Sequence, residues 1–325
     1  MRRRLAQRLE RIWYGSQPAP PWLAAAEAIY RAFAGRRIAR PHKPPPCPVV
    51  VVGNLVAGGS GKTPVVAALA EYLTRAGLAV AIVSRGYGGR EPLWPMRVTA
   101  ASTASAVGDE ALELFGKTGL PVWVCARRAR ALRRAVRGGA DVVLSDDGLQ
   151  HAALRRSFEI CVVDGRRAFG NRRLLPAGPL RQPLARLDTV DLVLVKRTPN
   201  DPGHDLPGTE FWLQPRGLRL VAATGGQVPE PPQAVDAVAG IADPVPFFEQ
   251  LEASGFIVRR HPLVDHEPLR DEFLAGLVGP IVMTAKDAVR LGPVMRTDIY
   301  ALDVHARLPQ PVLDQVLAHV REFSA

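Results

Sequence analysis

The chain has 325 residues, 47% of them apolar and 22% charged, which describes a globular protein long enough for two domains and excludes a disordered chain. The net charge of +11 is uneven, because residues 1–45 hold ten Arg or Lys and only two Glu, a net charge of +8. A body that is nearly balanced argues against a nucleic-acid-binding face. Three widely spaced cysteines indicate reduced thiols in a cytosol-facing protein rather than a zinc site.

The first predicted element is a basic, aromatic-rich helix within residues 20–40. Its apolar run, Trp22 to Ala34, is broken by one Glu and one Arg, so it is too short to span a bilayer. It also starts too late for a signal peptide. Aromatic residues interleaved with arginines suit an amphipathic helix lying on an anionic membrane surface, and we therefore predict that residues 1–45 associate with membranes. The alternative is a helix packed on the body of the protein itself.

Beyond the Pro-rich stretch 40–48, short apolar runs alternate with helical patterns. Strands are predicted at 49–53, 79–84, 121–125, 141–147, 159–164 and 191–196, and helices at 62–77, 108–119 and 128–139. Continuous apolar runs that alternate with helices predict a mostly parallel sheet with helices on both faces. Residues 46–205 are therefore predicted to form the core domain.

The composition changes around residues 198–233, which are rich in Pro, Gly and Asp and are typical of turns. A second α/β pattern follows, with strands predicted at 236–242, 256–263 and 280–287 and helices at 244–254 and 268–277. We predict a smaller C-terminal α/β domain over residues 206–325.

The stretch "NLVAGGSGKTPVV", residues 54–66, lies between a predicted strand and a predicted helix. Its glycines allow backbone N–H groups to curl around phosphate, and the positive end of the following helix adds to the attraction. The strict P-loop pattern has Gly where this chain has Val56. The predicted nucleotide-binding residues are Gly58, Gly59, Ser60, Gly61, Lys62 and Thr63. A P-loop NTPase-like fold follows from this context.

Two acids, Asp146 and Asp147, end an apolar strand in the manner of a Walker B acid, and together with Thr63 they are predicted to hold Mg²⁺. Two adjacent acids by themselves are more often a solvated strand end. A guanine-binding N-K-x-D motif is absent. Ala57 stands where membrane-partitioning ATPases carry an extra Lys. Both observations favour a transferase over a switch.

Other polar residues lie where ligands bind in open α/β sheets. Asp109 and Glu110 are near a predicted helix start, where a carboxylate can simply complement the helix dipole. Arg85 and Tyr87 follow a strand and could hold an anionic acceptor. Arg90, Gln150 and His151 are further polar residues in such places. Asp265 and His266 lie in a loop before a predicted helix, where a single His is usually only a surface residue.

Together these stretches resemble the tetraacyldisaccharide 4′-kinase family, which acts in lipid A synthesis in Gram-negative bacteria. The resemblance is carried, in family order, by "VVVGNLVAGGSGKTP", "VSRGYGG", "GDE", "DDGLQH", "VVDGRRAFGNRRLLPAGPLR", "VAGIADPVPFF", "DHEPL" and "MTAKDAV". It implies transfer of the γ-phosphoryl group of ATP, with Mg²⁺, to the 4′-hydroxyl of an acylated glucosamine disaccharide 1-phosphate. The implied place is the anionic cytoplasmic face of the inner membrane, with no nucleic acid and no obligate protein partner.

The resemblance also implies roles for individual residues. Asp109 matches the catalytic carboxylate of the family and His266 its partner, while Lys62 stabilises the transferred phosphoryl group. Residues expected to contact the acceptor are Arg85, Tyr87, Gln150, His151 and Arg127. Either Arg127 or Arg128 is also expected to stabilise charge during the transfer, together with Lys62 and Mg²⁺. Because Asp109 and His266 fall in different predicted domains, we expect domain closure to assemble the site.

Three positions depart from the family pattern. Val56 replaces the usual Thr or Ser, which matters little if only the backbone is used there. Gln182 stands where Glu is common, and Ala285 also replaces a usual Glu. If the Glu at 182 helps to hold Mg²⁺ in other members, this chain relies more on its two adjacent aspartates.

Two alternative functions would explain part of these sequence features. A membrane-associated P-loop ATPase switch explains the loop, the acids and the basic N-terminus, but neither Asp109 nor His266. A soluble small-molecule kinase would use the same core without a membrane, and binding to membranes at low but not at high salt would speak against it.

Overall fold

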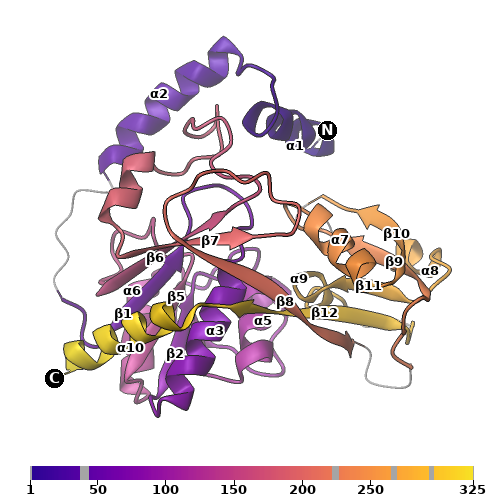
Figure 1. The fold of residues 1–325 in the computed structure, drawn as a ribbon. Coiled ribbons are helices and arrows are strands. Elements are labelled where there is room, and N and C mark those ends of the chain that lie inside the picture. Colours follow the sequence, from indigo (N-terminus) through magenta and orange to yellow (C-terminus); the bar gives the residue numbers. More distant parts are fainter. Residues whose placement is uncertain (1, 37–43, 222–226, 265–268, 293–295, 325) are drawn as a thin grey trace.

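A twelve-stranded, mostly parallel sheet organises the protein (Figure 1), and its strand order is β10-β9-β11-β12-β8-β7-β6-β1-β5-β2-β4-β3. The computed structural model describes residues 2–36, 44–221, 227–264, 269–292 and 296–324. The predicted α/β class, with helices on both faces of the sheet, is confirmed.

The first seven strands form the larger part of the sheet. They are β1 (Val49–Gly53), β2 (Val80–Ser84), β3 (Met96–Arg97), β4 (Val122–Val124), β5 (Val142–Asp146), β6 (Phe158–Asp164) and β7 (Leu192–Arg197). β1 lies between β5 and β6 and is parallel to both. Alternate residues of β1 face opposite sides: Val50 and Val52 join one apolar cluster, and Val49 and Val51 join the other. A strand buried on both faces explains why the run is continuously apolar.

Helices cover the two faces of this part. They are α3 (Lys62–Arg75), α4 (Ala104–Val107), α5 (Asp109–Thr118), α6 (Arg128–Arg137) and the 3₁₀ helix η1 (Leu184–Thr189). α3 and α5 pack on one face through Val65 and Leu114. α6 packs on the other face through Ala131, Leu132 and Ala135.

In the described residues of the C-terminal part there are five further strands and four helices. They are β8 (Thr209–Leu220), β9 (Ala234–Ala239), β10 (Ile257–Pro262), β11 (Ile281–Thr284), β12 (Ile299–Arg307), α7 (Val245–Ala253), α8 (Asp271–Ala275), α9 (Ala285–Ala288) and α10 (Gln310–Ser324). β8 and β12 form a long antiparallel ribbon that joins the two parts of the sheet. α10 returns to the first part, where Val312, Val316 and Val320 join the cluster under α3 and α5. The domain boundary near residue 206 stays a prediction, and the sheet continues across it.

Two predicted elements differ from the observed ones. β8 runs through the stretch 198–233, which the composition indicates to be turn-rich. Most of its residues are exposed or half-buried, so the stretch lacks the apolar pattern from which a strand is predicted. Its stability comes from pairing along β12 rather than from burial. The strand predicted at 280–287 ends at Thr284, whose hydroxyl caps a short helix by accepting a hydrogen bond from Asp287 N at 3.1 Å.

The N-terminal helices α1 (Arg2–Trp13) and α2 (Pro21–Arg36) pack on the body of the protein. Ile12 and Leu23 are buried together, and the Trp13 indole donates to Pro176 O at 3.0 Å. This is the packed arrangement that the sequence left as an alternative. The outer side of α2 nevertheless leaves Trp22 63% and Ile29 64% exposed. Among the described residues, no helix has the length and apolar character needed to cross a membrane.

Candidate active site

The P-loop connects β1 to α3 at the carboxyl edge of the sheet. Gly58 and Gly61 have positive φ angles of 112° and 86°, a region that glycine occupies without strain. α3 begins at Lys62 directly after Gly61, so the unpaired N–H groups of its first turn face the loop. A Cβ atom at Gly61 would lie 3.1 Å from the Lys196 side chain, which packs against the loop. The loop has the backbone geometry that a phosphate cradle needs, and phosphate binding by its residues stays a prediction.

The remaining predicted loop residues surround that cradle. Gly59 has open space where a side chain would stand. Ser60 is buried, and its hydroxyl has no hydrogen-bond partner among the described residues. Thr63 is half-buried in the first turn of α3, and the Lys62 side chain is buried. The loop thus presents backbone N–H groups, one buried ammonium group and two hydroxyls to a ligand.

Asp147 joins the loop to a segment far away in the sequence. It follows β5 with a positive φ of 50°, and its carboxylate lies 3.5 Å from Lys62 Nζ. Arg181 Nη1 donates to the same carboxylate at 2.8 Å. Burial raises the pKa of Asp147, but the nearby charges of Lys62 and Arg181 outweigh it and hold this pKa well below its ordinary value. Asp147 is therefore a carboxylate at neutral pH.

Asp146 has the properties of a cation ligand. It is the last residue of β5 and pairs in register with Val52, just before the P-loop. It is buried, and neither carboxylate oxygen has a hydrogen-bond partner within the described part of the chain. Burial, together with the charge of Glu110, raises its pKa. Burying a carboxylate without a partner is energetically unfavourable, and a divalent cation held by Asp146 and the Thr63 hydroxyl would compensate it. These residues therefore fit Mg²⁺.

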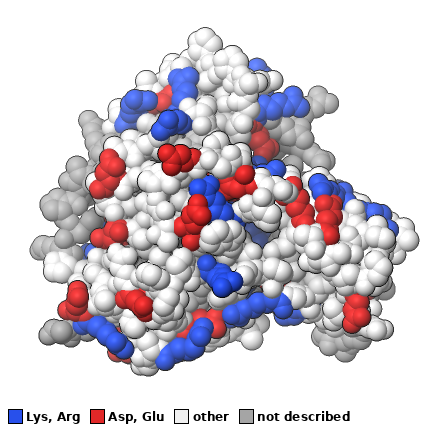
Figure 2. All heavy atoms as spheres, viewed as in Figure 1, with Lys and Arg blue, Asp and Glu red and all other residues white. Residues whose placement is uncertain are grey.

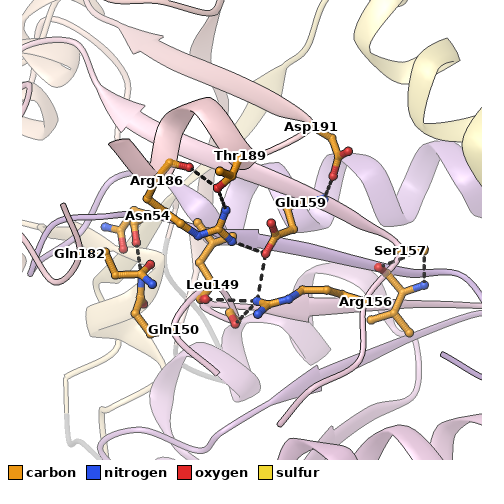
Figure 3. A network of polar contacts seen from close by, with 12 residues as sticks. Asn54, Leu149, Gln150, Arg156, Ser157, Glu159, Gln182, Arg186, Thr189 and Asp191 are labelled. Carbon is orange, nitrogen blue, oxygen red and sulfur yellow. Dashed lines mark hydrogen bonds and ion pairs between the residues drawn. The ribbon is translucent and has the colours of Figure 1, made fainter. Parts of the chain in front are cut away.

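The loop after β5 is fixed by a polar network (Figure 3). Gln150 Nε2 donates to Asn54 O at 2.8 Å and to Gln182 Oε1 at 3.1 Å. Arg156 Nη1 donates to the carbonyl groups of Gly148 and Leu149 and pairs with Glu159 on β6 at 3.1 Å. Arg186 from η1 contacts the same Glu159 carboxylate. This network holds the segment that carries the two aspartates and Gln150 against β1 and β6.

His151 lies at the end of the same segment. Its ring is half-buried, and burial followed by the charge of Arg128 lowers its pKa, so it is neutral near pH 7. Arg128 is itself buried and donates to Asp146 O at 3.1 Å. Its neighbour Arg127 is exposed at the start of α6. Of the two arginines that the sequence offers, Arg128 is the one in direct contact with the aspartate strand.

Asp109 lies on the junction between the two parts of the sheet. It is the first residue of α5, is buried, and accepts a hydrogen bond from Arg290 Nε at 2.8 Å. Arg290 Nη1 is in turn held by Asp287 at 3.1 Å and by Gly240 O at 3.4 Å. Figure 2 shows that basic and acidic side chains are mixed over the visible face of the molecule, including the region between its two parts. The partner predicted for Asp109, His266, lies outside the described residues.

Arg85 and Tyr87 follow β2 at the same edge. Both side chains are exposed, and Arg85 Nε pairs with Glu91 at 3.1 Å. An exposed ion pair of this kind is weak, so Arg85 can release Glu91 and bind another anion instead. The arrangement is compatible with their predicted contact to an acceptor.

Three residues of this edge were not singled out from the sequence: Arg181, Arg290 and Lys196. Lys196 is the last residue but one of β7, and its Nζ lies 2.6 Å from the carboxylate of Asp164, which ends β6. The sequence contains a feature that could have indicated Lys196, because a charged residue follows an apolar strand here just as in β5. Arg181 and Arg290 lie in the stretches "LLPAGPLR" and "MTAKDAVR", but their partners are far away in the sequence and no local pattern predicts them.

Comparisons with known proteins identify the family and the fold that the chain resembles. A model of the family described as tetraacyldisaccharide-1-P 4′-kinase matches residues 19–321. A tetraacyldisaccharide 4′-kinase of Alkalilimnicola ehrlichii is 47% identical over 273 residues, which cover 82% of this chain and 80% of the relative. One of Pseudomonas fluorescens is 40% identical over 319 residues, 94% of each chain. LpxK from Aquifex aeolicus, crystallised in complex with ATP, has the same fold, with a TM-score of 0.73 at 23% identity over 91% of this chain and 98% of that one.

Proposed function

The chain belongs to the tetraacyldisaccharide-1-P 4′-kinase family, and on that premise we propose how its site works. The protein is an ATP-dependent kinase that phosphorylates the 4′-hydroxyl of tetraacyldisaccharide 1-phosphate in lipid A biosynthesis. Its acceptor is thus a lipid A precursor disaccharide. Phosphoryl transfer requires mainly positioning and charge stabilisation from a protein, so each side chain can be given a role from its charge and position.

The P-loop holds the nucleotide. Backbone N–H groups between Gly58 and Gly61 bind the β- and γ-phosphates, and Lys62 balances the charge that develops on the transferred group. Mg²⁺ would be held by Thr63 and the aspartates at the end of β5, and it would neutralise phosphate oxygens. The ion pair of Asp147 with Lys62 keeps the ammonium group aimed at the loop. The convergence of these groups at one strand edge is the observation that carries this proposal.

Asp109 accepts the proton of the 4′-hydroxyl. A buried carboxylate at a helix start can serve as a base when its partner orients it, and Arg290 provides that orientation from the other part of the sheet. His266 is the proposed second partner. Because Asp109 and His266 fall in different predicted domains, the proposal includes a closing motion about the ribbon of β8 and β12 that completes the site and excludes water. Small-angle scattering that showed no compaction with nucleotide and acceptor bound would contradict this motion.

The acceptor is held at the same edge and reaches it from a membrane. The proposed contacts are Arg85, Tyr87, Arg127, Gln150 and His151, whose positive and polar groups suit a phosphorylated sugar. The exposed Trp22 and Ile29 on α2 would lie in the headgroup region of an anionic bilayer. We place the enzyme at the cytoplasmic face of the inner membrane of a Gram-negative bacterium, where ATP and the lipid meet.

A mixed-micelle assay with γ-labelled ATP, Mg²⁺ and the disaccharide 1-phosphate tests the proposal. We expect label in the lipid with the wild type and a decrease of at least about a hundredfold for Asp109→Ala, because the loss of a general base typically costs that much. Asp109→Asn keeps the shape but not the basicity and should be equally impaired. Unchanged rates in both variants would remove Asp109 from the mechanism. ATP turnover without labelled lipid would favour a switch ATPase.

A further inference from the structure

The loop between β2 and β3 presents two large apolar side chains to solvent. Leu93 is 65% and Trp94 is 72% exposed. Single exposed apolar residues are ordinary on protein surfaces, but two adjacent ones, one of them Trp, at a loop tip are typical of surfaces that bind a partner.

The backbone of this loop tip is fixed, so the exposure is a property of the fold. Ala126 N donates to Pro92 O at 2.9 Å, and Leu93 O accepts from Arg130 Nη1 at 3.0 Å. The Arg130 guanidinium also lies over the Trp94 ring at 4.6 Å. One face of the Trp94 indole therefore stacks on the Arg130 guanidinium, and the rest of the ring is exposed to solvent.

The neighbouring helix α6 extends this tip with a basic surface. It contains five arginines and no acidic residue. With 3.6 residues per turn, Arg130, Arg133, Arg134 and Arg137 fall within roughly a third of the helix circumference, and they point away from the sheet. The opposite face carries the buried Ala131, Leu132 and Ala135. We call Leu93, Trp94, Arg130, Arg133, Arg134 and Arg137 the α6 patch.

The α6 patch lies on the same side of the protein as the N-terminal helices. α6 and Tyr30 of α2 both belong to the apolar cluster on one face of the sheet, whereas α3, α5 and α10 cover the other face (Figure 1). The patch also adjoins the active site, because α6 begins at Arg128, which contacts the last residue of β5. A flat surface in contact with α2 could therefore also contact the α6 patch and lie opposite the active site.

We propose that the α6 patch is a second contact with the anionic lipid bilayer, in addition to the N-terminal helices. This proposal rests on the proposed action on a membrane-embedded acceptor and adds a surface on the kinase core. The positive charge is complementary to anionic headgroups, and Trp94 and Leu93 have the size and polarity to enter the headgroup region. A second, separate contact restricts rotation of the core about the N-terminal helices, which favours an orientation with the acceptor site toward the membrane. Nucleic acid is a poorer fit, since it offers no apolar layer to the two protruding side chains.

Vesicle binding by the full chain tests the patch. Arg133→Gln, Arg134→Gln and Arg137→Gln are combined in one variant. The matched control carries Arg75→Gln, Arg216→Gln and Arg219→Gln, which removes the same charge from exposed sites on the α3 and β8 surface. On vesicles with a third of anionic lipid at 0.1 M salt, we expect the patch variant to bind about a hundredfold more weakly, because each arginine contributes about fivefold. The control should lose far less, and equal losses in the two variants would overturn the proposal.

A local probe separates the patch from the N-terminal helices. The three native cysteines are buried, so Trp94→Cys can carry an environment-sensitive fluorophore with little background. A blue shift on anionic but not on neutral vesicles would support insertion of the loop tip. An unchanged spectrum on vesicles that bind the protein would refute it.

The kinase reaction distinguishes failure of this proposal from failure of the proposed function. With the acceptor in detergent micelles, the patch variant should phosphorylate it at the wild-type rate, because none of its three arginines contacts the site. With the acceptor in anionic vesicles, we expect its rate to fall at least tenfold. Wild-type rates in both settings would overturn the role of the patch. A wild-type protein inactive in micelles would instead refute the proposed function itself.

Discussion

Replacing Arg290 by Gln tests whether the junction of the two parts positions the proposed base. Arg290 bridges two buried carboxylates, Asp109 at 2.8 Å and Asp287 at 3.1 Å. Removing one partner of a buried ion pair costs about 3–5 kcal/mol, because the remaining charge stays buried. Asp287 keeps hydrogen bonds from Gly240 N and Thr284. We therefore expect the free energy of unfolding, measured by urea titration, to decrease by about 3 kcal/mol, the lower end of that range.

The same variant should change catalysis in a distinctive way. Without Arg290, the Asp109 carboxylate loses the guanidinium group that orients it, so the chemical step should slow while nucleotide binding is retained. We expect kcat to fall about ten- to a hundredfold with little change in KM for ATP, and Arg290→Lys to recover part of it, since Lys keeps the charge but not the fork of donors.

Arg260 offers the matched control. Its guanidinium binds Glu252 with two hydrogen bonds at 2.8 and 2.6 Å, but both side chains are exposed. Arg260→Gln should therefore change the free energy of unfolding little and leave kcat unchanged. Equal losses of stability in the Arg290 and Arg260 variants, or an unchanged kcat for Arg290→Gln, would refute the reasoning.

Three further outcomes are expected. Lys62→Met should lower phosphoryl transfer at least about a hundredfold in the micelle assay, since it removes the buried charge at the P-loop, while a wild-type rate would contradict its role. Glu159→Ala should lower the free energy of unfolding by about 3 kcal/mol, because two buried arginines lose their shared carboxylate; a change below 1 kcal/mol would show that the network in Figure 3 relaxes. The low pKa of Asp147 contributes stability above its unfolded pKa of about 3.9, which is lost as the pH falls. Arg181→Met raises that pKa, so acid unfolding should begin at a higher pH than in the wild type, and an unshifted acid transition would contradict this.

Much of the fold could be predicted because its strands are buried on both faces. The run Val49–Gly53 is entirely apolar and lies between two parallel neighbours, as the pattern indicates. The P-loop could be predicted for a similar reason, since glycines and a Lys before a helix form the cradle through local backbone geometry. By contrast, the strand Thr209–Leu220 was hidden, because its stability comes from pairing with a strand some eighty residues later and not from its own pattern.

The sequence by itself determined the chemistry of this protein: a phosphate loop, two aspartates after a strand, and stretches that identify the acceptor class. Only the tertiary structure decided which charges meet. It paired Asp147 with Arg181, Asp109 with Arg290, and the loop tip at Trp94 with Arg130 of α6. Local patterns arise from backbone geometry and solvent exposure within a few residues. Ion pairs depend on which strand ends and helix starts the sheet brings to one edge, and that information is held by packing across the whole chain.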